Sequence, residues 1–303
     1  MPIVAVTQPV PVNPGGGFDY VVIDSQRDRV YAAHPGGGGL LIADADTGNV
    51  IGVIPVGPMH GLAVDPASGH VFTGNGDSRS VSEVDPDSQQ ILRTAIVDGP
   101  VDAIAYDPVL GRIYADEDNG NRVFVIDTKS FRQIAVIKLP GHKLEYIQID
   151  PENHNVYQNV ASDNEIAVIN PKTLKVGRIF PTPQLKNNHP LQYDADHHVL
   201  LAAGENNVLA VYDRSGRLLH QVNLPEHVDQ CDWEPSHQWL ACAGGGITLY
   251  SFDGTSDPKL LDDQKIAAGV HTTAIDPRTG TIWVVWSEQD TGGAFIQGFT
   301  YKP

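Results

Sequence analysis

The chain has 303 residues, 41% of them hydrophobic and 19% charged, which is the composition of an ordinary globular protein. Its 37 acidic side chains outnumber its 20 basic ones, so the formal net charge is −17. A surface of this sign repels phosphate backbones and anionic lipids, and we therefore expect neither a nucleic-acid partner nor a membrane partner.

The N-terminal segment carries no targeting signal that we can identify. Residues 1–9 lack both a basic stretch and a long apolar core, and no run of about 18 apolar residues that could cross a bilayer follows. We therefore expect a cytoplasmic protein, or an exported one whose leader has been removed.

A repeat with a period near 42 residues runs through the chain. Each copy has a short apolar segment that ends in an acid, then a turn that usually contains Gly, then further β-rich segments. The aligned acids are Asp24, Asp65, Asp107, Asp150, Asp194, Glu234 and Asp276, which lie 40 to 44 residues apart. Four short strands per unit at this spacing are typical of propeller blades. The sequence therefore predicts an all-β, seven-bladed propeller with four antiparallel strands per blade.

The blades follow one another as a single domain. They are expected at approximately 18–58, 59–100, 101–142, 143–187, 188–227, 228–269 and 270–303. The second blade illustrates the pattern, with strands expected at 60–64, 71–74, 80–84 and 91–96. The seventh unit has only three such segments, at 270–275, 281–286 and 294–301. Because residues 3–10 resemble the outer strands, we expect them to complete blade seven and close the ring.

The chain has two cysteines, Cys231 and Cys242. The repeat places them on neighbouring strands, roughly opposite each other. We expect two small buried thiols in a reducing compartment, because free cysteines are commonly buried in this way. The sequence does not decide whether the two are paired.

Several second strands carry a further motif. The second copy reads Val-Phe-Thr-Gly-Asn-Gly-Asp-Ser-Arg-Ser-Val-Ser-Glu-Val-Asp over 71–85, and related segments begin at Val30, Ile113 and Val156. This pattern resembles the YVTN-repeat family of seven-bladed propellers. The resemblance implies a fold but no single activity, since such relatives include surface-layer-like proteins, subunits of cofactor enzymes, lactonases and lyases.

One repeat position is ionisable in all seven copies. Five residues before each aligned acid stand Asp19, His60, Asp102, Glu145, His189, Asp229 and His271. This position begins the innermost strand of each blade, so the repeat predicts a ring of acids and histidines around one mouth of the axial channel. A solvated entrance with acids that cap turns is the plainer interpretation.

The order of residues in this ring favours a metal site. His60, His189 and His271 are spread as evenly as three residues can be among seven blades, so they are the candidate ligands of a divalent ion with an open coordination position. Zn, Mn, Fe, Cu and Ni all accept imidazole. The four acids between them, which would orient the histidines or act as catalytic bases, are Asp19, Asp102, Glu145 and Asp229. In a wider channel the same ring would bind a cationic ligand or transfer protons without a metal.

Loops that are expected at the same mouth supply possible substrate contacts. These are His34, Glu117, His142, His227 and Trp286. Trp286 is an equally good candidate for packing inside its blade. Asp232, on an expected inner strand, is a candidate buried acid.

The hypothesis that follows is a metal-dependent enzyme, of hydrolase or lyase type, that acts on a small polar molecule at the axial mouth. Two alternatives stay open. The first is a non-catalytic propeller that presents its faces to a protein partner, and the second is a metal-free binder of a cationic small molecule.

Overall fold

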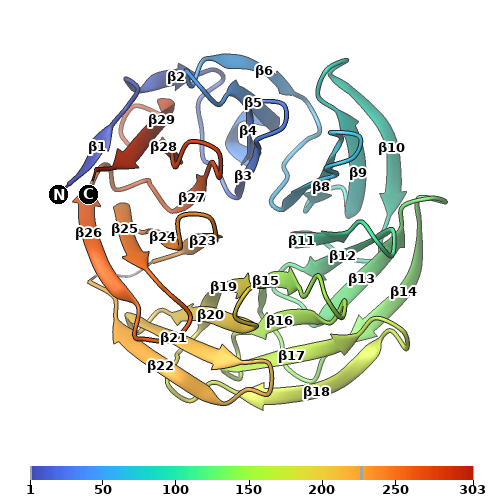
Figure 1. Cartoon of the computed structure of the whole chain (residues 1–303). Helices are drawn as coiled ribbons and strands as arrows, with labels where there is room; N and C mark the ends of the chain where they lie inside the picture. Colours follow the sequence, from blue (N-terminus) through green and yellow to red (C-terminus); the bar gives the residue numbers. More distant parts are fainter. Residues whose placement is uncertain (1, 226–227, 303) are drawn as a thin grey trace.

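The structure, a computed structural model, describes residues 2–225 and 228–302. Seven antiparallel sheets stand around a central axis, which confirms the predicted seven-bladed propeller (Figure 1). Among the described residues the one helical element is a turn of 3-10 helix, Pro35–Gly37. No helix in these ranges has the length and apolar character needed to cross a bilayer.

Each blade runs from an innermost strand at the axis to an outermost strand at the rim (Figure 1). Blade one is β3 (Val21–Asp24), β4 (Arg29–His34), β5 (Gly39–Asp44) and β6 (Val50–Ile54). Blade two is β7 (Leu62–Val64), β8 (Val71–Asn75), β9 (Ser80–Asp85) and β10 (Gln90–Ile96). Blade three is β11 (Val101–Asp107), β12 (Arg112–Glu117), β13 (Arg122–Asp127) and β14 (Arg132–Lys138). Blade four is β15 (Leu144–Ile149), β16 (Val156–Val160), β17 (Glu165–Asn170) and β18 (Lys175–Pro181).

The remaining blades repeat the plan. Blade five is β19 (Asn188–Asp194), β20 (Val199–Gly204), β21 (Val208–Asp213) and β22 (Leu218–Asn223). Blade six is β23 (Gln230–Glu234), β24 (Trp239–Ala243), β25 (Gly246–Ser251) and β26 (Lys259–Lys265). Blade seven is β27 (Thr272–Ile275), β28 (Ile282–Ser287) and β29 (Ala294–Tyr301), completed by β1 (Ile3–Ala5) and β2 (Val10–Val12).

The N-terminal segment closes the ring, as predicted. Ile3 pairs with Tyr301 and Val12 pairs with Ala294, so both ends of the chain share one sheet. The segment forms two short strands rather than one, with residues 6–9 outside the ladder. Pro9 lies in this gap, and it has no N–H to contribute to a ladder. The closure leaves no blade with a missing outer strand.

The repeated acids hold the turns that follow the innermost strands. The carboxylate of Asp107 accepts hydrogen bonds from the backbone N–H groups of Val109 and Leu110, and that of Asp150 accepts one from Glu152. Such bonds let an acid fix a turn in place. The aromatic residue of the YVTN-like motif packs between blades, as Tyr31, Tyr114 and Tyr157 are at most 1% exposed. The most regular parts of the repeat thus build the fold.

The two cysteines form a disulfide. Cys231 and Cys242 are directly opposite each other on β23 and β24, with their Cα atoms 4.0 Å apart. Such a close antiparallel pair brings the two side chains together. The expectation of two free thiols is therefore wrong, although both residues are buried as expected.

Candidate functional site

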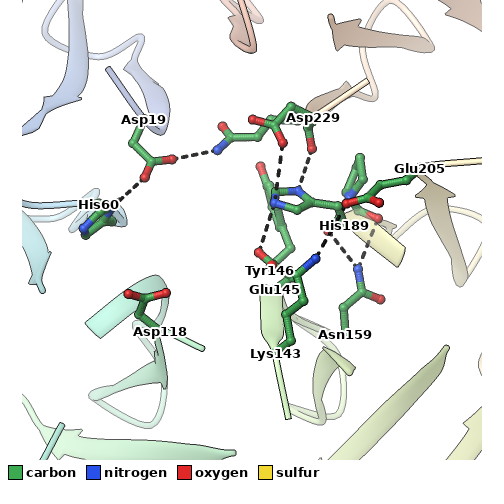
Figure 2. Close-up of polar contacts among 12 residues, drawn as sticks. Asp19, His60, Asp118, Lys143, Glu145, Tyr146, Asn159, His189, Glu205 and Asp229 are labelled. Atoms are coloured by element: carbon green, nitrogen blue, oxygen red, sulfur yellow. Dashed lines mark hydrogen bonds and ion pairs between the residues drawn. The ribbon is translucent and has the colours of Figure 1, made fainter. Parts of the chain in front are cut away.

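The seven ionisable residues of the repeated position are half-buried in the structure. Asp19, His60, Asp229 and His271 come just before innermost strands, and Asp102, Glu145 and His189 lie within the first residues of theirs. Figure 2 shows five of them at the centre of the ring, where they meet as histidine–carboxylate contacts between blades. The contacts divide them into two groups.

The first group contains Asp19, His60 and Asp102. The His60 Nδ1 atom is 2.7 Å from the Asp19 carboxylate, and one potential ligand atom from each of the three residues lies within 4.8 Å of the others. The hydrogen bond to Asp19 raises the pKa of His60 against the opposing effect of burial. The Nε2 atom of His60 has no hydrogen-bond partner among the described residues, so it can accept a ligand.

Asp102 is the most unusual acid of this group. Burial, together with the charges of Asp116 and Asp19, raises its pKa well above the ordinary value. No described residue forms a hydrogen bond with its carboxylate. Asp116 is fully buried, and burial raises its pKa to about 8. One Asp116 oxygen accepts a hydrogen bond from Gln158, while the other has no partner. Two neighbouring carboxylates, the half-buried Asp102 and the buried Asp116, therefore form no ion pair with a basic side chain of the described residues.

The second group contains Glu145, His189, Asp229 and His271. His189 Nε2 is 3.0 Å from the Glu145 carboxylate, and its Nδ1 is 2.7 Å from the backbone oxygen of Asp229. His271 Nδ1 is 2.8 Å from the Asp229 carboxylate, and its Nε2 is 3.0 Å from the Phe18 carbonyl. Because all four partners are acceptors, both nitrogens of each ring must donate, and both rings are imidazolium ions.

The pKa shifts agree with this geometry. Burial alone would lower the pKa of His189, but its hydrogen bond to Glu145 and the charges of Glu145 and Asp229 raise it to about 9. The Asp229 carboxylate likewise raises the pKa of His271 against the effect of burial. An imidazolium has no lone pair for a metal.

The three histidines are therefore not brought together as one ligand set. Among the described residues, the group of potential ligands that does gather is Asp19, His60 and Asp102. His189 and His271 instead bond carboxylates and carbonyls of adjacent blades. The physical reason is that three of the four acids of the ring, Asp19, Glu145 and Asp229, lie close enough to a neighbouring histidine to pair with it directly.

A hydrogen bond across the mouth joins the two groups. The Gln230 amide donates to the second oxygen of Asp19 over 2.9 Å, from blade six to blade one. Beside it a cavity of about 700 Å³ is lined by Asp229, His271 and Lys265 together with backbone of residues 244–245. This cavity offers space for a small molecule next to the second group.

Three of the candidate substrate contacts, His34, Glu117 and Trp286, form contacts with other groups of the protein instead. His34 is fully buried, and its two ring nitrogens lie 2.9 and 2.8 Å from the carbonyls of Gly17 and Pro14. Glu117 accepts hydrogen bonds from Arg122. Trp286 is buried and stacks on Phe295 within blade seven, which matches the packing alternative.

The last two candidates differ. His142 is exposed, and its backbone N–H donates to the Ser162 hydroxyl. His227 lies outside the described residues. Among the described contacts of His142, none reaches a residue of the ring.

Two important residues were missed in the sequence. Asp116 stands at the fourth position of the YVTN-like motif, where other copies have Ala33, Gly74 and Asn159. A comparison of that column would have singled out the one acid among small or amide residues. Gln230 comes directly after the ring position, and nothing in its sequence context indicates that it crosses the mouth.

Comparison with known proteins supports the fold alone. No family model matches the chain, so the YVTN relationship remains a resemblance, and no curated protein matches it. Among solved structures, the chain is similar to Kuenenia stuttgartiensis hydrazine synthase, with a TM-score of 0.81 and 15% sequence identity over 94% of this chain and 96% of that one. The fold and site together define a seven-bladed propeller with a histidine–carboxylate ring at one mouth.

Proposed function

We propose that the axial mouth binds a divalent cation through Asp19, His60 and Asp102, and that the protein is a metal-dependent enzyme of hydrolase or lyase type. The observation that carries this proposal is the cluster itself, in which Asp19, His60 and Asp102 each bring one potential ligand atom within 4.8 Å of the others, while the Asp102 carboxylate lacks any hydrogen bond to the described residues. Imidazole with two carboxylates is a donor set suited to Zn²⁺ or Mn²⁺.

Two buried polar groups near the cluster support the proposal. One Asp116 oxygen and the Tyr20 hydroxyl have no hydrogen-bond partner, and both are close enough to Asp102 for their charges to interact. Burial and the charges of Asp102 and Asp19 raise the pKa of Tyr20. A dication at this point would compensate the negative charge that the described chain leaves unpaired.

Residues around the proposed cation site would orient its ligands and stabilise charge on a substrate. A bound cation would polarise a substrate carbonyl or activate a water molecule. Asp19 bonds both His60 and Gln230, and so orients the imidazole. The imidazolium ring of His271 lines the cavity and would stabilise negative charge on a substrate rather than accept a proton.

Calorimetric titration of chelator-treated protein with Mn²⁺ and Zn²⁺ tests the cation site. We expect one ion per chain. His60→Ala should weaken its binding beyond the roughly 10–100-fold typical of a residue outside the coordination sphere, whereas His271→Ala should retain it. Failure of wild-type protein to bind either ion, or equal binding by His60→Ala, would reject the site.

Catalysis requires a separate measurement. Small lactones and simple carboxylic esters are suitable probes, with proton release followed at constant pH. We expect turnover that depends on the added metal and is lost in Asp102→Asn. Metal binding without turnover of any probe would leave the cation site intact and count against the hydrolase class.

A scaffold role is the second candidate, and one observation favours it. Exposed apolar side chains occur on the outer strands of blades two and three, where Ile96 is 70% exposed and Ile134 is 47% exposed. Patches of this kind often mark protein contacts. A scaffold predicts that partner binding survives chelation and His60→Ala.

A further inference from the structure

A second cavity lies on the propeller axis, at the mouth opposite the ring. Its volume is about 630 Å³, within the range of small-molecule sites. It lies among the innermost strands β3, β7, β11, β15, β23 and β27, towards the ends that carry the turn-forming acids. Tyr20 and Tyr146, whose ring centres are 5.2 Å apart, line its inner part.

The wall of this cavity is mostly apolar and carries no positive charge. Its aliphatic lining includes Val22, Leu62, Ala63, Ala105, Ile149 and Ile275. The lining residues contain two acids, Asp232 and Glu234, and no Lys, Arg or His. A cavity of this character disfavours anions and accepts apolar groups.

The two acids have different surroundings. Glu234 accepts hydrogen bonds from the backbone of Ser236 and His237 and pairs with the His237 ring, so its charge is already compensated. Asp232 accepts a hydrogen bond from the Ile275 backbone N–H over 2.7 Å. No basic side chain of the described chain forms an ion pair with it. Asp232 is therefore the one cavity acid that lacks a counter-ion.

Two other polar groups at the inner end, Gln192 and Tyr146, are already hydrogen-bonded, whereas the Tyr20 hydroxyl has no partner. The Gln192 amide donates to the Tyr146 hydroxyl and to the Cys231 carbonyl, and the Tyr146 hydroxyl donates to that same carbonyl. These bonds fix the floor of the cavity beside Asp232. A ligand that entered would meet a mostly apolar wall, the unpaired hydroxyl of Tyr20 and one carboxylate without a counter-ion, that of Asp232.

We propose that this cavity binds an organic cation, an ammonium group on an apolar body, with Asp232 as its counter-ion. The site is separate from the metal site of the proposed function and does not depend on it. A carboxylate inside an apolar channel attracts an ammonium more strongly than it would in water, because fewer solvent dipoles screen the charge. The apolar wall would in turn cover the ligand's carbon atoms.

Choline and its neutral carbon isostere, dimethylbutanol, form a matched pair of probes because they have nearly the same shape. Titration calorimetry or saturation-transfer NMR should show choline binding at least about tenfold more tightly, a difference of roughly 1.4 kcal/mol. Asp232→Asn keeps the side-chain shape and should abolish this preference. Asp257→Asn, in the exposed segment before β26, is the control and should leave choline binding unchanged.

Two further arms keep the test decisive if Asp232→Asn does not fold. Ala105→Leu narrows the cavity and should weaken the binding of both probes.

Choline keeps its charge at every pH, whereas burial raises the pKa of Asp232 to about 7. Choline affinity should therefore fall as pH is lowered from about 8 to about 5. The pKa of Glu234 is lowered and those of Tyr20, Tyr106 and Tyr146 are raised, so they do not titrate in this window. Equal affinity for both probes, no choline binding, or a flat pH profile would overturn the proposal.

Discussion

The His271 imidazole donates a hydrogen bond to the Asp229 carboxylate across 2.8 Å, and this contact ties blade seven to blade six. His189 makes the equivalent link from blade five to blades four and six. Pairs between distant parts of the chain thus reinforce the ring at the junctions between its blades. Their contribution depends on the charge of the histidines and is therefore open to measurement by pH.

Stability should fall as pH rises through the range in which His189 loses its proton. Its pKa is about 9 in the folded chain and near the ordinary 6.5 when unfolded. The stabilisation is therefore fully present below about pH 6.5 and disappears above about pH 9, with a magnitude of roughly 3 kcal/mol. Urea unfolding of wild-type protein and His189→Gln at several pH values should show a difference that shrinks with rising pH. A difference that does not change with pH would contradict this account.

Asp102→Asn should stabilise the metal-free protein. Burial and the charges of Asp116 and Asp19 disfavour the ionised Asp102 carboxylate, so a neutral amide of the same shape removes that repulsion. We expect a gain of about 1–3 kcal/mol at neutral pH in thermal or urea unfolding. Asp85→Asn is a matched control with the opposite sign, because the Asp85 carboxylate accepts hydrogen bonds from Asp87 and Ser88. Destabilisation by Asp102→Asn would show that the carboxylate has a partner that we have not recognised.

The disulfide should be detectable chemically and should stabilise the fold. Unreduced denatured protein should contain no thiol that reacts with a thiol reagent, whereas reduced protein should contain two. Replacement of Cys231 and Cys242 by Ala should lower the free energy of unfolding by roughly 2–4 kcal/mol. Two reactive thiols in unreduced protein would disprove the pairing.

Removal of residues 1–12 should destabilise the chain strongly. Ile3 is 3% exposed and Val12 is 2% exposed, and burial of each is worth roughly 1.5–3 kcal/mol. The deletion also exposes the edge of β29, so we expect both a lower melting temperature and self-association, measured by calorimetry and sedimentation. Val6→Ser is the control, since Val6 is 49% exposed and should change stability by less than about 0.5 kcal/mol. A truncated chain that melts like the full one would show that closure contributes little.

The fold could be predicted from the sequence because the pattern of one blade recurs seven times along the chain. The aligned acids and buried aromatic residues recur at fixed positions, so each copy supports the interpretation of the others. The site was harder to predict because its chemistry depends on the residues that differ between the seven copies of the repeat. The spacing of the repeat predicted that His60, His189 and His271 lie in one ring. It could not predict which ring nitrogen of each histidine has no hydrogen-bond partner. The 2.8 Å contact of His271 with Asp229 and the reach of Gln230 to Asp19 depend on side-chain positions that periodicity does not specify.

The shared sheet of blade seven also bears on how the molecule can be re-engineered. Because Ile3 faces Tyr301 across one ladder, a short peptide could join the original ends without spanning the ring. New ends could then be opened in the exposed turn at residues 254–257 of blade six. A circularly permuted chain would keep every strand pair but would start and finish its synthesis in a different blade. The order in which blades emerge from the ribosome could in this way be varied without altering the native contacts.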